Sequence, residues 1–404
     1  MADSVANPIP SLLSQRAQRS GLPRLGNPRD SASRISFLAG FPDPGSLPKG
    51  DIIESTRVAL ERDGEWALQY GSARGYPGLI AELVTKLGRD QRIEAAPENI
   101  LITNGASQAL ALIVDLLVDP GDVVLSEAPT WSGAVHNFHA AGAEVRDIPI
   151  DGEGLDVAAL ERALERLRAE GKRAKLLYFI PNFQNPTGVT TTLERRQRIA
   201  DLARAHSLPI VEDDAYFDLR YAGSTLPTVY SLDSTGLVMY LGTFSKIMAA
   251  GMRLGWCVAE AEVISRLTGL KTEGGTSPFA GHVAAEFCSS GTLVEHVGEL
   301  RSLYLKRRDA MLAGLQAHMP PGASWTTPEG GFFIWLTLPE GVSVAAIQPL
   351  AREQNLEFLP GAATYYHGEG DNQIRLSYSF ADEEQIATGI KMLGELVATQ
   401  LSGR

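Results

Sequence analysis

Cysteine is scarce in this sequence, which has only Cys257 and Cys288 among its 404 residues. Two cysteines are too few for a disulfide framework or a thiolate metal cluster. The seven histidines form no zinc-binding motif, and neither a Gly-x-Ser-x-Gly motif nor a Cys–His pair indicates nucleophilic hydrolysis. We therefore expect no metal site, and a reducing cytoplasm as the compartment.

A net positive charge and long apolar runs are missing as well. The formal net charge is −12, whereas proteins that bind nucleic acids or anionic membranes need a positive field to attract phosphate. No apolar run approaches the roughly eighteen residues of a membrane span, and the N-terminus lacks the apolar core of a secretory signal. The sequence predicts a cytoplasmic protein that binds neither nucleic acids nor membranes.

The chain is long enough for two domains, and its residue pattern changes twice. Residues 1–49 are rich in proline, glycine, serine and arginine, which indicates an extended segment with many turns. Over 50–290, short strands separated by helices predict a mostly parallel sheet covered on both faces. Residues 291–404 predict a smaller α+β domain, which the first segment would join. The expected helices lie near 51–63, 77–90, 106–118, 156–169, 192–206, 260–271, 280–318, 344–354 and 382–401, and the expected strands at 100–103, 122–126, 176–180, 209–213, 237–242, 330–339 and 372–380.

The segment TFSKIMAAGMRLGW, residues 243–256, holds the first candidate site. Lys246 is one of eight lysines and has apolar neighbours on both sides. Such surroundings disfavour the ammonium form and lower the pKa of a lysine towards a neutral amine, the form that bonds to an aldehyde cofactor. Thr243, Ser245 and Arg253 lie within seven residues of it and could hold a phosphate dianion. An isolated lysine would more often extend from a buried element to water, but these flanking groups favour the catalytic interpretation.

The segment PIVEDDAYFDL, residues 209–219, leads from apolar residues into carboxylates. These carboxylates fall where a parallel strand ends, and open α/β sheets bind ligands at the carboxyl ends of their strands. Asp213 could pair there with a protonated pyridine nitrogen, and Tyr216, three residues on, could point into the same site. A solvated acidic turn is the alternative, and this segment alone does not separate the two.

Four further features complete the candidate site. Asn185 begins a turn, Asn-Pro-Thr-Gly, directly after a buried strand, and could donate to the phenolate oxygen of a pyridoxal ring. Over 100–117 a strand enters a helix through Asn-Gly-Ala-Ser, which offers backbone N–H groups to an anion or is a simple helix start. Trp131 could stack on a planar ring or belong to the core. Arg375 lies in an apolar strand and needs a carboxylate, from the protein or from a substrate.

Taken together and in their order along the chain, these motifs resemble the class I and II aminotransferases of pyridoxal-phosphate (PLP) fold type I. The resemblance is strongest to the subgroup of 2-aminoadipate aminotransferases and to the catalytic half of MocR-type regulators. It implies an α/β fold with a large domain of seven mostly parallel strands flanked by helices, a smaller α+β domain, and a homodimer. Nine segments between residues 37 and 380 carry it: FLAGFPDP, QYGSARGYPGL, TNGASQAL, PNFQNPTG, VEDDAYFDLRY, FSKIMAAGMRLGW, GGTSPFAGH, PEGGFFIWL and IRLSYSF.

The resemblance also implies pyridoxal 5′-phosphate as the cofactor and a role for each motif. Lys246 would bond to the cofactor and move the proton between Cα and C4′, while Asp213 would keep the pyridine nitrogen protonated. Asn185 and Tyr216 would contact the phenolic oxygen, and Trp131 would stack on the ring. The residues implied to bind phosphate are Ala106, Ser107, Thr243, Ser245, Arg253 and, from the neighbouring subunit, Tyr70. Those implied to bind substrate are Arg375, which grips the α-carboxylate, Asn185, and Gly40, which leaves room for closure.

The activity implied is transfer of an amino group between an L-amino acid and a 2-oxo acid by a ping-pong mechanism. A decarboxylase, lyase, racemase or cyclase on the same scaffold is the alternative, because the outcome depends on which Cα bond stands perpendicular to the ring. A MocR-type regulator would need a basic DNA-binding module, for which we expect no room in the first fifty residues. Ala250 replaces the family's usual proline, Ala363 to Tyr365 replace its frequent phenylalanine, and residues 1–49 match poorly, so no substrate is assigned.

Overall fold

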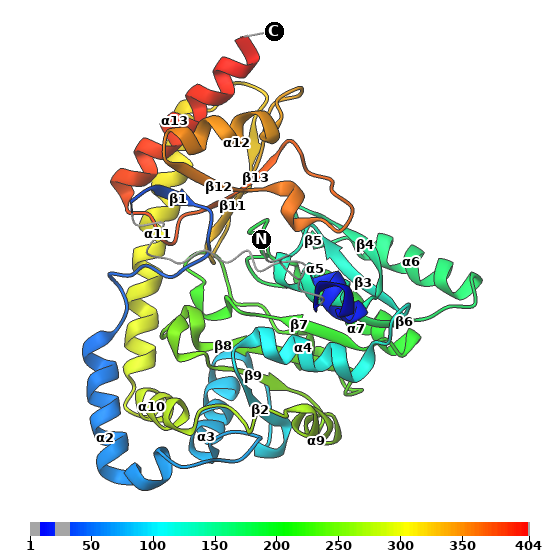
Figure 1. The fold of residues 1–404 in the computed structure, drawn as a ribbon, viewed down its shortest axis with the longest axis vertical. Helices are drawn as coiled ribbons and strands as arrows, with labels where there is room; N and C mark the ends of the chain where they lie inside the picture. Colours follow the sequence, from blue (N-terminus) through cyan, green and yellow to red (C-terminus); the bar gives the residue numbers. More distant parts are fainter. Residues whose placement is uncertain (1–8, 21–32, 403–404) are drawn as a thin grey trace, which may run out of the picture.

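Two sheets organise residues 9–20 and 33–402, which the computed structural model describes (Figure 1). The smaller sheet lies at the top of Figure 1, above the larger one, and the long helix α11, Thr292–His318, runs beside both. In this part of the chain, no helix combines the length and the apolar character that crossing a bilayer requires.

The larger sheet has eight strands in the order β2-β9-β8-β7-β6-β3-β4-β5. Strands β8, β7, β6, β3 and β4 pair in parallel, while β9 and β5 run antiparallel to their neighbours. The predicted mostly parallel sheet is confirmed, with the two-residue β5 added to the seven strands expected. The strands are β2 (Ile100–Thr103), β3 (Val123–Ala128), β4 (Glu144–Asp151), β5 (Gly154–Leu155), β6 (Ala174–Phe179), β7 (Ile210–Asp213), β8 (Val238–Thr243) and β9 (Gly255–Val258).

Alternate side chains of the central strand β6 enter two different cores. Leu176 and Tyr178 pack with α4, α5 and α9, whereas Leu177 and Phe179 pack with α6, α7 and α8. Because successive strand residues point to opposite faces, a run such as LLYF is buried on both sides of a covered parallel sheet. The helices of this part are α2 (Lys49–Ala67), α3 (Pro77–Lys86), α4 (Ala106–Leu117), α5 (Ser132–Ala141), α6 (Val157–Ala169), α7 (Leu193–His206), α8 (Val229–Leu232), α9 (Ala261–Leu270) and α10 (Pro278–Ser289).

The smaller sheet has five strands in the order β1-β12-β13-β11-β10. Its edge strand β1 comes from the N-terminal part of the chain and pairs in parallel with β12, while the other strands are antiparallel. Residues Ile35–Phe37 of the N-terminal segment therefore belong to this sheet. The strands are β1 (Ile35–Phe37), β10 (Ser324–Trp325), β11 (Phe333–Thr337), β12 (Leu356–Pro360) and β13 (Gln373–Ser377), and the helices packed around them are α11, α12 (Val344–Glu353) and α13 (Glu383–Ser402).

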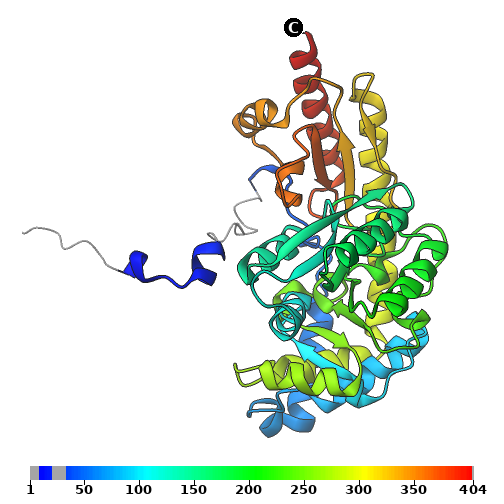
Figure 2. The same cartoon turned by 90° about the vertical axis from the view of Figure 1, so that its right-hand side faces the viewer.

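Short helical pieces complete the described chain. Figure 2 shows Ile9–Leu12 standing out from the body of the protein, with Gln15–Ser20 closer to it. Arg16 of this second piece pairs with Asp115 of α4 at 3.0 Å. They are η1 (Ile9–Leu12), α1 (Gln15–Ser20), η3 (Leu87–Gln91), η4 (Pro97–Asn99), η5 (Phe217–Leu219), η6 (Phe244–Lys246), η7 (Ala250–Met252) and η8 (Gly361–Thr364).

One expected helix was wrong in its extent. The stretch 280–318 consists of two helices, α10 and α11, which Gly291 separates in a left-handed conformation with φ +86°. Glycine adopts this conformation without the steric cost that a side chain adds, so it ends one helix and precedes the next.

Candidate active site

Lys246 lies directly after β8, at the carboxyl edge of the large sheet. Its Nζ donates a hydrogen bond to the carbonyl oxygen of Gly40 at 2.9 Å and stands 5.8 and 5.6 Å from the ring centroids of Tyr216 and Phe332. Removal from water lowers the pKa of this amine to about 8, with further contributions from the charges of Arg375 and Arg253. The apolar setting that the sequence predicted therefore yields an amine that loses its proton close to neutrality.

Asp213, the last residue of β7, presents one carboxylate oxygen without a partner. Its Oδ2 accepts a hydrogen bond from the hydroxyl of Tyr178 at 2.8 Å, while Oδ1 is buried and has no hydrogen-bond partner among the described residues. Burial raises the pKa of this carboxyl to about 6, against the hydrogen bonds from Tyr178 and from the backbone of Ala215. Buried polar atoms are rarely left unpaired, and the N–H of a protonated pyridine is a donor that fits Oδ1.

Arg375, on β13, reaches from the smaller sheet towards the same place. Its guanidinium donates to Oδ1 of Asn185 at 2.9 Å and to the carbonyl oxygen of Leu38 at 2.5 Å, lies 4.2 Å from the ring centroid of Phe333, and keeps an unpartnered buried Nε. Burial lowers the pKa of Arg375 to about 10. No carboxylate of the described residues pairs with it, and its pairing with a substrate carboxylate stays a prediction.

The residues expected around a phosphate, apart from Tyr70, lie around the start of α4. Gly105 precedes that helix with φ +76°, no side chain caps its first N–H groups, and a Cβ at this glycine would stand 2.9 Å from Arg253. A Cβ on Gly255 would stand 2.6 Å from the backbone nitrogen of Ala106, so the helix start and β9 touch. Free N–H groups beside a guanidinium suit a phosphate. Ser107 lies in the first turn of α4. Thr243, the last residue of β8, donates from Oγ1 to Oγ of Ser245 at 2.9 Å.

Gly40, Trp131 and Tyr70 occupy different surroundings. A Cβ on Gly40 would stand 2.6 Å from Phe333 and 3.7 Å from the hydroxyl of Tyr216, so this position has room only for glycine. Trp131 begins α5 and is partly exposed, with its ring against the α-carbon of Gly133. Tyr70 is 92% exposed and stands apart from the other candidates in its own chain.

Two buried groups of the site were not predicted. Tyr178, described above, supports Asp213. Glu127, at the end of β3, accepts hydrogen bonds from the backbone of Ile180 at 3.0 Å and from Gln184 at 2.8 Å. Gln184 in turn accepts from Thr187 and so holds the turn that carries Asn185. Burial raises the pKa of Glu127 well above its ordinary range, and nearby Asp213 adds to the effect. A polar residue inside an apolar strand, as in LLYFI, is the one sequence signal for such groups.

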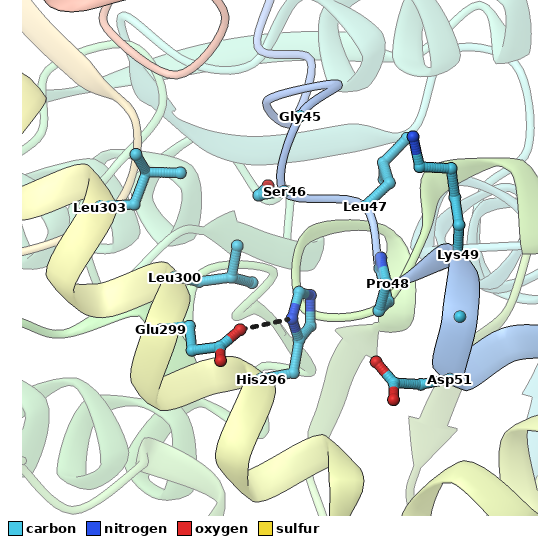
Figure 3. A pocket seen from close by; sticks show the side chains of 11 residues that line it. Gly45, Ser46, Leu47, Pro48, Lys49, Asp51, His296, Glu299, Leu300 and Leu303 are labelled. Carbon is cyan, nitrogen blue, oxygen red and sulfur yellow. Dashed lines mark ion pairs between the residues drawn. The ribbon is translucent and has the colours of Figure 1, made fainter.

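A cavity of about 410 Å³ lies elsewhere, between residues 45–51 and helix α11 (Figure 3). His296 and Glu299 face each other on its helical wall at 3.9 Å, and none of the predicted site residues lines it. Among residues 9–20 and 33–402, no three histidine, cysteine, aspartate or glutamate side chains are grouped so as to hold a metal ion.

Comparison with known proteins agrees with this geometry. The family model described as aminotransferase class I and II matches residues 45–393. Aromatic-amino-acid aminotransferase 1 of Thermococcus litoralis is 38% identical over 374 residues, which cover 92% of this chain and 90% of that protein. The 2-aminoadipate transaminase of Thermus thermophilus is 36% identical over 364 residues, 89% of each chain.

Solved structures show the same likeness. Kynurenine aminotransferase of Pyrococcus horikoshii, in complex with PMP, superposes with a TM-score of 0.92 at 38% identity, over 97% of this chain and 98% of that one. The α-aminoadipate aminotransferase of Thermus thermophilus, complexed with N-(5′-phosphopyridoxyl)-L-leucine, gives a TM-score of 0.90 at 34% identity, over 98% and 100%. Both neighbours are in complex with derivatives of pyridoxal phosphate.

Proposed function

This chain belongs to the class I and II aminotransferases, and from that premise we propose that the residues around Lys246 hold pyridoxal phosphate and carry out the reaction. The protein is a PLP-dependent aminotransferase of fold type I, which moves an amino group between an amino acid and a 2-oxo acid. The two relatives described above are named as an aminotransferase and a transaminase, so a decarboxylase, lyase, racemase or cyclase is not favoured. The observation that carries our proposal is the unpartnered Oδ1 of Asp213 in the same site as the neutralisable amine of Lys246.

The cofactor is held, in this proposal, by three groups of contacts. When bound, pyridoxal phosphate supplies an aldehyde that bonds to amines and a ring that withdraws electrons from the bonds at Cα. Asp213 would accept a hydrogen bond from the protonated ring nitrogen on Oδ1 and keep that nitrogen charged. Trp131 would cover the ring, and Asn185 and Tyr216 would donate to its phenolic oxygen. Ala106, Ser107, Thr243, Ser245 and Arg253 would bind the phosphate, together with Tyr70 of a second subunit.

Lys246 moves the proton in this proposal. Its pKa of about 8 means that about a tenth of the amine is unprotonated at pH 7 and about half at pH 8. The neutral amine would take the proton from the substrate Cα and deliver it to C4′ of the cofactor. The carbonyl oxygen of Gly40 accepts a hydrogen bond from Nζ at 2.9 Å and so orients the free amine. The rings of Tyr216 and Phe332 exclude water from its surroundings, which strengthens each charged contact in the site.

Arg375 binds the substrate α-carboxylate. Its planar fork matches two carboxylate oxygens, and Asn185 and the carbonyl of Leu38 hold that fork in place. Because Arg375 belongs to the smaller sheet and Lys246 to the larger one, the substrate lies between the two. We accordingly place a large cofactor-binding domain at residues 50–290 and a small domain at 291–404, with residues 1–49 contributing to the small domain and the substrate site.

We propose that the active unit is a cytoplasmic homodimer in which Tyr70 reaches the phosphate of the other subunit. Three large side chains near the end of α2 support this arrangement, because Trp66, Leu68 and Tyr70 are 71%, 73% and 92% exposed. Exposed apolar side chains that lie together usually mark an interface.

The half-reaction with an amino acid alone provides a test of the proposed function. Purified holoenzyme is mixed with a panel of amino acids and no 2-oxo acid, and the cofactor spectrum is followed. We expect a stable shift to the spectrum of pyridoxamine phosphate, with stoichiometric 2-oxo acid. Release of carbon dioxide, ammonia or the D-amino acid, without that stable shift, would contradict aminotransfer. Lys246→Ala protein is the control, and its cofactor spectrum should not respond.

A further inference from the structure

Asp213 depends on one side chain for its orientation. Tyr178, on β6, donates its hydroxyl hydrogen to Oδ2 at 2.8 Å, and this is the only side-chain hydrogen bond to the carboxylate among the described residues. The χ2 torsion of an aspartate has broad, shallow preferences, so a strand-end carboxylate is not oriented by its own geometry. The Tyr178 contact removes that freedom and leaves Oδ1 as the free oxygen.

Packing fixes the ring of Tyr178 in turn. The tyrosine is fully buried, and Phe138 of α5 meets its ring edge-on, with centroids 5.8 Å apart and planes at 73°. Tyr366, which precedes β13, packs in the same core and bonds Ser126 of β3 at 3.0 Å. A ring enclosed in this way directs its hydroxyl at Asp213 and cannot turn to another acceptor without breaking the packing.

We propose that Tyr178 is a positioning residue for amino-group transfer, which orients Asp213 so that Oδ1 faces the pyridine nitrogen and which stabilises the ionised carboxylate. The inference rests on the proposed role of Asp213. It adds a group that touches neither cofactor nor substrate and acts through the carboxylate alone.

The charges around this pair determine the direction of the pH effect. Burial raises the pKa of Tyr178 well above its ordinary value, and the adjacent Asp213 adds to this, so the phenol stays a donor at every working pH. Glu127 from β3 and Tyr366 from the segment before β13 also face Tyr178, while Tyr216 faces Asp213. None of these groups donates a hydrogen bond to Asp213. The hydroxyl of Tyr178 is therefore the side-chain group that stabilises the charge of the Asp213 carboxylate.

The sign follows from the pKa of Asp213, which is about 6 with Tyr178 in place. Below that pH the carboxyl takes up a proton and no longer accepts from a protonated ring nitrogen. Removing the hydroxyl takes away a contact that lowers the pKa, so the variant binds its proton at a higher pH. In Tyr178→Phe, the loss of PLP affinity on acidification therefore occurs at a higher pH.

The experiment measures the affinity of the apoprotein for PLP against pH, together with the ¹⁵N NMR signal of the ring nitrogen in holoprotein loaded with [¹⁵N]PLP. In Tyr178→Phe we expect the acid midpoint to rise by about one pH unit, the size of a lost charge-assisted hydrogen bond, and affinity at about pH 5, below both midpoints, to fall about tenfold. The nitrogen signal should shift towards the deprotonated form. Replacing Tyr178 with 3,5-difluorotyrosine, a stronger donor of similar shape, should move the midpoint the other way.

A matched control separates this effect from the loss of a buried hydroxyl. Tyr240 on β8 is also fully buried and bonds Asp214 at 3.4 Å and Gln91 at 3.1 Å, so Tyr240→Phe removes a comparable group outside the site. Its midpoint and nitrogen signal should match wild type. Unchanged values in both Tyr178 variants, with Asp213→Asn altering the nitrogen signal, would overturn the role of Tyr178 alone. An unchanged nitrogen signal in Asp213→Asn would overturn the role of Asp213 itself.

Discussion

Burial shifts the two main ionisable groups of the site in opposite directions. It raises the pKa of Asp213 to about 6 and lowers that of Lys246 to about 8, because removal from water penalises whichever form is charged. Strongly shifted groups that share a cleft are typical of reaction centres. The unpartnered Oδ1 of Asp213 and Nε of Arg375 add two places where a charged ligand would restore lost hydrogen bonds.

Asp213→Asn tests the carboxylate directly. Asparagine keeps the shape but removes the charge that keeps the ring nitrogen protonated, so we expect turnover to fall about a hundredfold or more while PLP still binds. Steady-state kinetics and the cofactor spectrum of the purified variant measure both quantities. Near-normal turnover would move this role to another acid, with Asp214 as the next candidate.

Arg375→Lys tests the substrate fork. A lysine keeps the charge but has no planar pair of donors, so apparent affinity should weaken for amino acid and 2-oxo acid alike, by about 1.5–3 kcal/mol. Separate half-reactions with each substrate provide the two values. If both affinities stay at wild-type values, Arg375 has a structural function in the contact with Asn185 and Leu38.

At the scale of elements, the loop of residues 38–48, between β1 and α2, contacts site residues from both sheets. Its carbonyl groups at Leu38 and Gly40 accept hydrogen bonds from Arg375 and Lys246, one from each side. Farther along, Asp43 pairs with the buried Arg307 of α11 at 2.8 Å. This loop therefore positions the substrate-binding and the proton-moving residue together.

Gly40→Ala probes that loop. The added Cβ would stand 2.6 Å from Phe333 and push the loop away from both cations, so we expect kcat/KM to fall about tenfold or more, the effect of displacing two oriented groups. Gly298→Ala in α11 is the control, because its Cβ would meet no atom within 4 Å. The control should keep full activity and gain up to about 1 kcal/mol in free energy of unfolding. Equal activity of the two variants would refute the positioning role of the loop.

Strand and turn patterns predicted most of these elements, and their limits are physical. The carboxylate at the end of β7 and the lysine after β8 could be placed from local sequence alone. Strands β1, β4, β5, β9, β10 and β12 and helices α1, α5 and α8 were missed. Strand β4 is half-buried and of mixed polarity, and the other missed strands are only two to five residues long, which is too short for a clear pattern. Tyr178 and Glu127 could not be predicted, since their importance comes from contacts with residues 35 and 57 positions away in the chain.

At the scale of the whole molecule, our proposal has a second subunit supply Tyr70 to the site. Mixed dimers test this directly. Lys246→Ala and Tyr70→Phe proteins are exchanged together; if Tyr70 acts across the interface, a mixed dimer has one site with both defects and one with neither. Activity should then rise well above the sum of the two parents. Proven subunit exchange without any gain would show that Tyr70 acts in its own chain or has no catalytic function.

The central claim, that Lys246 carries the cofactor, is tested by chemical fixation. Holoenzyme is reduced with borohydride, digested, and analysed by mass spectrometry for the lysine that bears the reduced pyridoxyl phosphate. The account predicts that, of the eight lysines, Lys246 alone is modified, and that Lys246→Ala protein loses its visible absorbance and its fixed cofactor. Stoichiometric fixation on another lysine, or a Lys246→Ala protein that stays yellow and is still labelled, would contradict it.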